Sequence, residues 1–135
     1  MDNTSLIKNI EIEKLKFRRD FLRVARSGNK WVSPSMVVQG KWRCENPVKL
    51  ANEDKKIFVG FTVSKRVGNS VIRNRVRRRL RAAARGALIA EGALGKEFVI
   101  IGRNKALNYP FKSIINDLTW SVRKLDEQLK KKPRE

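Results

Sequence analysis

The segment SKRVGNSVIRNRVRRRLRAAAR, residues 64–85, carries the strongest local pattern in this sequence. Gly68 and Asn69 form a turn signal directly after a strand-like run, and Asn69 or Ser70 can cap a following helix. The residues after the turn are mainly Arg, Ala and Leu, which favour a helix. One apolar stripe on the helical wheel contains Ile72, Val76, Leu80, Ala83 and Ala87. We therefore predict a helix that packs one face against a core.

The rest of this helix is densely positive. Its arginines include Arg73 and Arg75 near the start and Arg77, Arg78, Arg81 and Arg85 on the outer face. So many guanidinium groups repel one another unless a polyanion lies against them. A solvated charged face usually mixes both signs, and here no acidic residue occurs before Glu91. The pattern favours a polyanion-binding surface over a merely solvated one.

The composition indicates the same kind of partner. The 135 residues include 32 Lys and Arg against 13 Asp and Glu, a formal net charge of +19. A standing polyanionic partner explains this imbalance most easily, with nucleic acid the first candidate and an anionic membrane the second. No long apolar run or signal-peptide pattern is present, and Cys44 is alone, which fits a reducing cytoplasm. We expect a cytoplasmic protein.

The chain is predicted to form a single domain, residues 15–129, between a loosely held leader, residues 1–14, and a basic tail, residues 130–135. Alternating or continuous apolar residues predict strands over 31–44, with a break or edge at Pro34, and over 57–64 and 98–101. Helices are expected over about 15–27, ending at Gly28, and after Pro110. A strand, a helix and a strand in succession favour a parallel pair, for which the default crossover is right-handed.

Phe17 and Phe21 lie one helical turn apart in the expected first helix, among several arginines. Packing in the core is the simpler interpretation of both rings. The alternative is an aromatic surface beside a basic groove, on which single-stranded nucleic acid stacks. The polar face of the next strand, with Gln39 and Lys41, would flank such a groove or face solvent.

Several kinds of catalytic chemistry are absent from the sequence. It contains no His, which excludes His-based acid–base catalysis and Cys-His metal sites, and one Cys cannot form a zinc site. The acidic residues are scattered and show no spaced carboxylate cluster of the kind that a two-metal nuclease needs. We therefore expect a binding protein that has neither a metal site nor catalytic residues of its own.

The stretch from Ser64 to Arg78 closely resembles the signature of the bacterial ribonuclease P protein subunit. That signature is Ser-Lys-basic, then Gly-Asn-Ala-Val, then Arg-Asn-Arg with further basic residues. The chain has SKR at 64–66, GNSV at 68–71 and RNR at 73–75. The similarity extends from about Leu15 to Leu125, which is all of the chain except its ends.

The resemblance implies an α+β fold of the ribosomal protein S5 domain 2 type, an αβββαβα sandwich with a left-handed βαβ crossover in place of the default. It also implies the protein subunit of a ribonucleoprotein endoribonuclease, inactive alone. With the catalytic ribonuclease P RNA, that enzyme hydrolyses the phosphodiester that joins the 5′ leader to precursor tRNA, using Mg²⁺ held mainly by the RNA and the substrate. Neither DNA nor a membrane is then an expected partner. The alternative is a structural RNA-binding protein of the ribosomal type, which shares the fold.

By resemblance, two groups of residues bind RNA. The predicted contacts to the catalytic RNA are Lys65, Arg66, Arg73, Asn74, Arg75, Arg77, Arg78, Arg81 and Arg85. The predicted cleft for the leader, between the first helix and the sheet, includes Phe17, Phe21, Gln39 and Lys41. Two further cleft aromatics of the family are replaced here by Ala25 and Gln39. Either the stacking surface is thinner in this chain, or Phe17 substitutes from the preceding turn.

Overall fold

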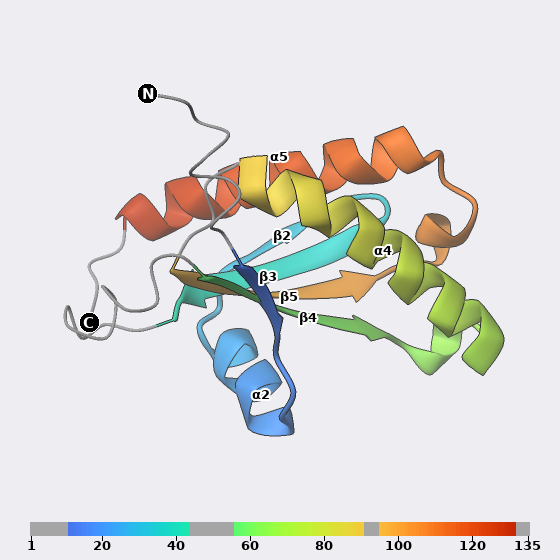
Figure 1. Cartoon of the computed structure of the whole chain (residues 1–135), viewed down its shortest axis with the longest axis horizontal. Helices are drawn as coiled ribbons and strands as arrows, with labels where there is room; N and C mark the ends of the chain where they lie inside the picture. Colours follow the sequence, from blue (N-terminus) through green and yellow to red (C-terminus); the bar gives the residue numbers. More distant parts are fainter. Residues whose placement is uncertain (1–10, 44–55, 91–94, 132–135) are drawn as a thin grey trace.

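In the computed structural model, residues 11–43, 56–90 and 95–131 are described, and they form one five-stranded sheet with helices on both faces (Figure 1). The strands are β1 (Glu11–Lys14), β2 (Lys30–Val32), β3 (Met36–Trp42), β4 (Lys56–Val63) and β5 (Lys96–Gly102). The helices are α2 (Arg18–Arg26), α4 (Ser70–Ala90) and α5 (Phe111–Lys131), with short 3-10 turns η1 (Lys65–Val67) and η2 (Asn104–Leu107). Apart from β1, this is the predicted αβββαβα order.

The sheet order is β1-β4-β5-β3-β2, and helix α4 connects the parallel strands β4 and β5. In Figure 1 both strands run to the right, β5 lies behind β4, and α4 lies above them. The chain runs to the right along β4, returns to the left through α4 above the sheet, and runs to the right again along β5 behind β4. A turn that recedes from the viewer in this sense is left-handed. The crossover thus follows the fold implied by the resemblance and departs from the right-handed default.

The main core lies between the sheet and the pair α4 and α5 (Figure 1). It is built from apolar stripes on both helices and the upper face of the strands, including Val76, Leu80, Ile114, Leu118, Val38, Ile57 and Ile100. Among the described residues, the opposite face carries the short helix α2 and a smaller cluster of Leu15, Val24, Phe58 and Val99. A nine-residue helix cannot cover a five-stranded sheet, so part of that face remains open.

Two predicted boundaries are wrong. Residues Glu11–Lys14 form strand β1, parallel to β4, and are not part of a loose leader, because backbone pairing with β4 holds them. Lys130 and Lys131 belong to α5 and not to a tail, since the buried Leu129 anchors the last turn and Lys130 pairs with Asp126 at 3.3 Å. Residues 1–10 and 132–135 lie outside the described ranges.

The strand predicted over residues 31–44 is in fact two antiparallel strands, β2 and β3, separated at Pro34. Ser35 fixes the connection, because its hydroxyl donates a hydrogen bond to Asp117 of α5 at 2.7 Å. Cys44 lies outside the described residues. The predicted break at Pro34 is confirmed. The residues between β2 and β3 form a turn, so the two strands are not continuous.

Candidate nucleic-acid interface

Polar side chains define the start of the arginine helix. The Asn69 side chain accepts a hydrogen bond from the backbone N–H of Ile72 at 3.0 Å and so caps α4. The Ser64 hydroxyl accepts from the backbone N–H of Arg66 at 3.1 Å, which caps the preceding turn η1. The exposed Lys65 and Arg66 are thereby held next to the N-terminus of α4, where the helix dipole adds positive potential.

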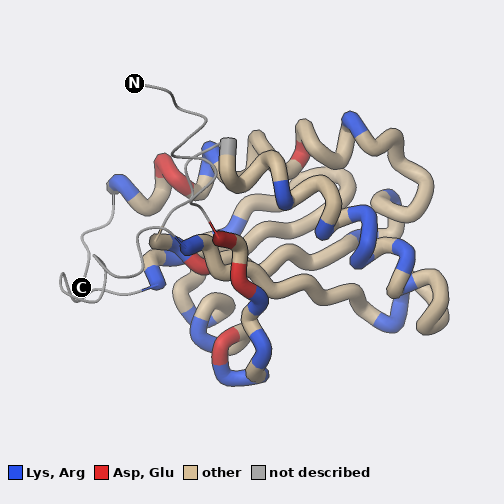
Figure 2. The backbone as a smooth tube through the Cα atoms, in the orientation of Figure 1, with Lys and Arg blue, Asp and Glu red and all other residues tan. Residues whose placement is uncertain are grey.

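Helix α4 buries the apolar stripe that was predicted. Its buried side chains are Val76, Leu80, Ala83, Ala84, Ala87 and Leu88, and Ile72 is half-buried. The exposed polar residues of the helix include Asn74, Arg75, Arg78, Arg81 and Arg85, while Arg73 and Arg77 are half-buried. Figure 2 shows Lys and Arg recurring along η1 and α4. The predicted positive residues therefore lie together along one element.

These arginines are oriented but not neutralised. Arg77 donates a hydrogen bond to the side chain of Asn74 at 2.6 Å, and Arg73 donates to the Ser70 hydroxyl at 3.3 Å. In residues 11–43, 56–90 and 95–131, no arginine of α4 forms an ion pair with a carboxylate. Asn74, predicted as an RNA contact, thus also orients Arg77. Unpaired guanidinium groups on a rigid helix are suited to binding phosphates.

Arg79 has a different role from its neighbours. Its guanidinium donates hydrogen bonds to the carbonyl oxygens of Ala106 and Leu107, both at 2.7 Å, and also to the carbonyl of Tyr109. These carbonyls belong to η2 and the turn that leads into α5. Arg79 therefore ties α4 to the start of α5, a role that nothing in the run of arginines distinguishes.

A groove of about 530 Å³ lies between α2 and the open part of the sheet. Its lining residues are Arg18, Phe21, Leu22 and Ala25 from α2, Gln39 from β3, Phe61 and Thr62 from β4, and Val99 and Ile101 from β5. The walls are mainly apolar, and an arginine, an amide and a threonine hydroxyl are the polar groups among them. Such a lining can accept a flat apolar group that carries a negative charge.

Phe21 is half-buried, and its ring lies directly over Gly60 of β4. A Cβ atom at position 60 would come within 2.5 Å of the Phe21 ring, so only glycine permits this approach. The ring packs beside the small cluster under α2 and also lines the groove. Phe21 is thus a packing residue that also lines the groove, and stacking of nucleic acid on its ring stays a prediction.

Phe17 and Lys41 do not line this groove. Phe17 precedes α2 in an extended conformation, is 56% exposed, and lines a separate hollow with Asp20, Arg43 and Phe58. It does not substitute for an aromatic residue at Ala25, because as the N-cap of α2 it lines that separate hollow and not the groove. Lys41 is half-buried two residues beyond Gln39 and lies outside the lining. Leu22, 39% exposed, is a groove residue that the sequence did not reveal.

Comparison with known proteins identifies the family. The family described as Ribonuclease P matches residues 11–126, a span that includes β1. The chain belongs to the ribonuclease P protein family. The ribonuclease P protein component of Ruegeria pomeroyi is 44% identical over 115 residues, which cover 84% of this chain and 86% of the relative. The component from Paramagnetospirillum magneticum is 39% identical over 114 residues, with coverage of 84% and 83%.

Solved structures of ribonuclease P proteins have the same fold. The protein of Staphylococcus aureus superposes with a TM-score of 0.59 at 25% identity, covering 82% of this chain and 92% of that one. The protein of Thermotoga maritima superposes with a TM-score of 0.58 at 22% identity, covering 90% and 98%. As a member of the ribonuclease P family, the chain is the protein subunit of a tRNA-processing ribonucleoprotein endonuclease, with the ribonuclease P RNA as its partner. The ribosomal-type alternative is not favoured.

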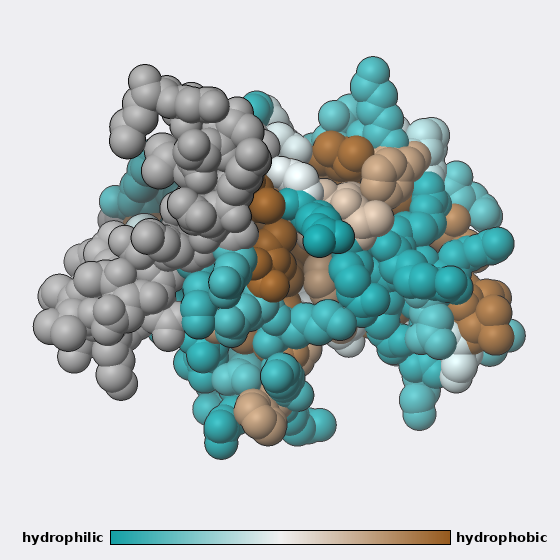
Figure 3. Space-filling view, viewed as in Figure 1, coloured by the Kyte–Doolittle hydropathy of each residue, from teal (hydrophilic) through white to brown (hydrophobic). Residues whose placement is uncertain are grey.

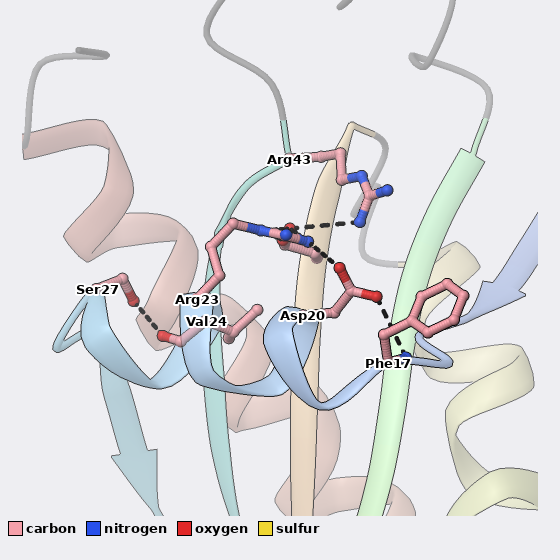
Figure 4. Close-up of polar contacts among 7 residues, drawn as sticks. Phe17, Asp20, Arg23, Val24, Ser27 and Arg43 are labelled. Atoms are coloured by element: carbon pink, nitrogen blue, oxygen red, sulfur yellow. Dashed lines mark hydrogen bonds and ion pairs between the residues drawn. The ribbon is translucent and has the colours of Figure 1, made fainter.

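In this ribonuclease P protein, a buried ionic cluster fixes α2 to the sheet (Figure 4). Glu97 of β5 is fully buried and accepts hydrogen bonds from Arg23 of α2 at 2.9–3.1 Å. Arg43 approaches the same carboxylate at 3.6 Å, and Asp20 pairs with Arg23 at 2.9 Å. Because Glu97 and Arg23 are 74 residues apart, no local pattern predicted the pair. The cluster sets the position of the helix that forms one wall of the groove.

Neighbouring charges and hydrogen bonds shift the pKa values of Asp20 and Arg23 in this cluster. Burial alone would raise the pKa of Asp20, but the hydrogen bond and charge of Arg23, with the Phe17 N–H, outweigh it and lower that pKa. The hydrogen bond with Glu97 is the main cause that raises the pKa of Arg23. On the other face of β5, Lys96 bonds Asp126 of α5, and Lys96 and Lys130 lower the Asp126 pKa against the opposing effect of burial. These pKa shifts favour the charged forms of Asp20, Arg23 and Asp126.

Two further findings concern the described ranges as a whole. Within them, no three His, Cys, Asp or Glu side chains are grouped so that they could hold a metal ion. Nor does any helix in those ranges have the length and apolar character needed to cross a membrane.

Proposed function

We propose that this protein uses two surfaces for two RNAs. The arginine face of α4, together with η1, binds the ribonuclease P RNA, and the groove beside Phe21 binds the single-stranded 5′ leader of precursor tRNA. One observation carries this division: α4 and α2 lie on opposite faces of the sheet (Figure 1). Because the two surfaces face opposite sides of the sheet, both RNAs can be held at once.

The groove residues suit a single strand. The half-buried ring of Phe21 offers a fixed surface for base stacking, and Gln39 offers an amide for a base edge. Arg18 at the rim can bind a phosphate. Since Ala25 and Gln39 stand where aromatic side chains were expected and Phe17 lies elsewhere, we infer a stacking surface limited to few bases.

The proposed reaction is hydrolysis of the phosphodiester between leader and tRNA by the assembled enzyme. Magnesium would activate water and stabilise developing charge, and the RNA and substrate would hold it. The acidic side chains of the described residues do not fit a magnesium cage, because Glu97 and Asp20 bind Arg23 and Asp126 binds Lys96. The role of this chain is to bind and orient the leader, and the protein alone is expected to cleave nothing.

A cleavage assay tests this function. Precursor tRNA is incubated across a magnesium series with the protein, with the ribonuclease P RNA, or with both. We expect no cleavage with the protein alone, and a lower magnesium requirement with both components than with the RNA alone. The affinity gain from the protein should be larger for a precursor with a leader than for tRNA without one. If magnesium requirement and affinity were unchanged by the protein, the proposal would fail.

A further inference from the structure

A second hollow, of about 480 Å³, lies on the α4 side of the sheet, between strand β1 and helix α4. Strand β1 pairs with residues 56–59 of β4, and no other described strand pairs with this edge of β4 beyond Val59. Phe61, on that unpaired stretch, is half-buried, and the small side chain of Ala84 leaves space beneath α4. Ile12 and Ile89 complete an apolar floor. In Figure 3, hydrophobic atoms in this region are flanked by hydrophilic ones.

Two exposed arginines of α4 lie at the rim of this hollow. The guanidinium of Arg81 lies 5.7 Å from the centre of the Phe61 ring, and Arg85 follows one turn later. Among the described residues, neither forms an ion pair, although acidic residues of β1 line the same hollow. One of them, Glu13, pairs instead with Lys56 at 3.1 Å. The hollow thus combines an apolar and aromatic floor with two arginines that form no ion pair among the described residues.

A nucleotide has the matching chemistry, because it joins an anionic phosphate to a flat apolar base. We propose that an unpaired nucleotide of the ribonuclease P RNA inserts its base into this hollow. The base packs against Phe61, Ile12 and Ile89, while Arg81 and Arg85 bind its phosphate and that of a neighbour. The volume lies within the range of about 300–1,000 Å³ that is common for small-ligand pockets. The inference rests on the proposed binding of this RNA by α4, and it adds a defined site for one base.

Site-directed crosslinking tests where the RNA lies. With Cys44 replaced by Ser, the variant Ile89→Cys carries a photoreactive aryl azide in the hollow, and Glu127→Cys on α5 serves as an exposed control. The assembled holoenzyme is irradiated with either the RNA subunit or the precursor tRNA labelled. We expect a crosslink from position 89 to one unpaired nucleotide of the RNA subunit, several-fold above the control. Crosslinking to the precursor alone, or none above the control in an active holoenzyme, overturns the inference.

Affinity measurements separate base insertion from phosphate binding. Ile12→Ala should weaken binding of the RNA subunit about tenfold, the scale of one lost stacking or packing contact, with no change in salt slope. Arg78→Ala, outside the hollow, should weaken binding and also flatten the salt slope. Thermal unfolding checks that both variants fold. Unchanged affinity in a folded Ile12→Ala variant overturns the inference, whereas failure of the unaltered protein to bind the RNA at all overturns the proposed function as well.

Discussion

The position of the Phe21 ring depends on Gly60, the residue that the ring covers. Its ring rests on the backbone of Gly60, so that one side is anchored while the groove remains open beside it. A ring held in place loses little conformational freedom when a base stacks on it. The same arrangement makes Gly60 a functional residue, although it carries no side chain.

Replacing Phe21 by Ala should weaken binding of precursor tRNA by about 1–3 kcal/mol, because one aromatic stacking surface is lost. Binding of tRNA without a leader should hardly change. Affinity for both substrates, measured with assembled holoenzyme, checks this. Phe17→Ala is the matched control, since it removes an exposed ring outside the groove and should leave both affinities near their original values. Equal losses for both substrates would show that Phe21 acts only through packing.

Helix α4 has two roles: Leu80 packs in the core, and the arginines beside it form the proposed RNA-binding face. Leu80 is fully buried, so Leu80→Ala should lower the free energy of unfolding by about 2–5 kcal/mol through lost contacts and a cavity. Denaturant unfolding measures the change. Val71→Ala, at a side chain 74% exposed on the same helix, should stay within about 0.5 kcal/mol of the original protein. Similar losses in the two variants would contradict the burial of this stripe.

Helix α2 depends on ionic contacts more than the other helices do. It is nine residues long and buries only Val24 among its apolar side chains, so its packing area is small. The bonds from Arg23 to the buried Glu97 supply a directional connection to the sheet. These directional bonds fix the distance between α2 and the sheet, and therefore the width of the groove. An apolar contact of the same small area would fix that distance less well.

Glu97→Gln should loosen α2 while leaving α5 in place. We expect the variant to lose roughly 1–3 kcal/mol of stability, below the value for a fully buried pair because Arg23 is partly exposed. Amide hydrogen exchange should accelerate in α2, and the preference for precursors with a leader should fall.

Asp126→Asn provides the control for this change, since it breaks the contact of the adjacent Lys96 with α5 on the other face of the sheet. Its hydrogen exchange should accelerate in α5, and its preference for a leader should be kept. If both variants lost that preference equally, the Glu97 cluster would have no specific effect on the groove.

Elements with local signals were predictable from the sequence, and those made by distant contacts were not. Asn69 and the stripe through Val76 and Leu80 lie within a few turns of one another, so α4 could be predicted. Strand β1 contains one apolar residue, Ile12, and forms because β4 is available to pair with it. The error at Phe17 has a local origin: this residue is the N-cap of α2 and is extended, so the helical wheel did not apply to its side chain.

The charge of the whole molecule is concentrated where no carboxylate balances it. The formal net charge is +19, and the described ion pairs involve α2, α5, strands β1, β4 and β5, and Arg43 after β3, rather than α4. Helix α4 thus carries much of the uncompensated charge of the described residues. Such a surface attracts a polyanion over distances longer than any single contact.

Replacing Arg77 and Arg81 by Ala should weaken association with the ribonuclease P RNA and flatten its dependence on salt. Each lost phosphate contact should lower the slope of log K against log salt by about 0.7–0.9, because fewer counterions are released on binding. Titrations at several salt concentrations measure the slope. Lys130→Ala, on an exposed lysine of α5, should leave the slope nearly unchanged. An undiminished slope in the double variant would contradict phosphate binding by α4.

Strand β1 also has a consequence for solubility. A sheet edge with free backbone N–H and C=O groups is a template on which another chain can add a strand. By pairing with residues 56–59, β1 covers the edge next to the buried side chains of Ile57 and Val59. A chain shortened to begin at Leu15 would expose that edge and would be prone to self-association, however strongly its positive charges repel. Four residues that resemble a dispensable leader thus cover part of the edge of β4.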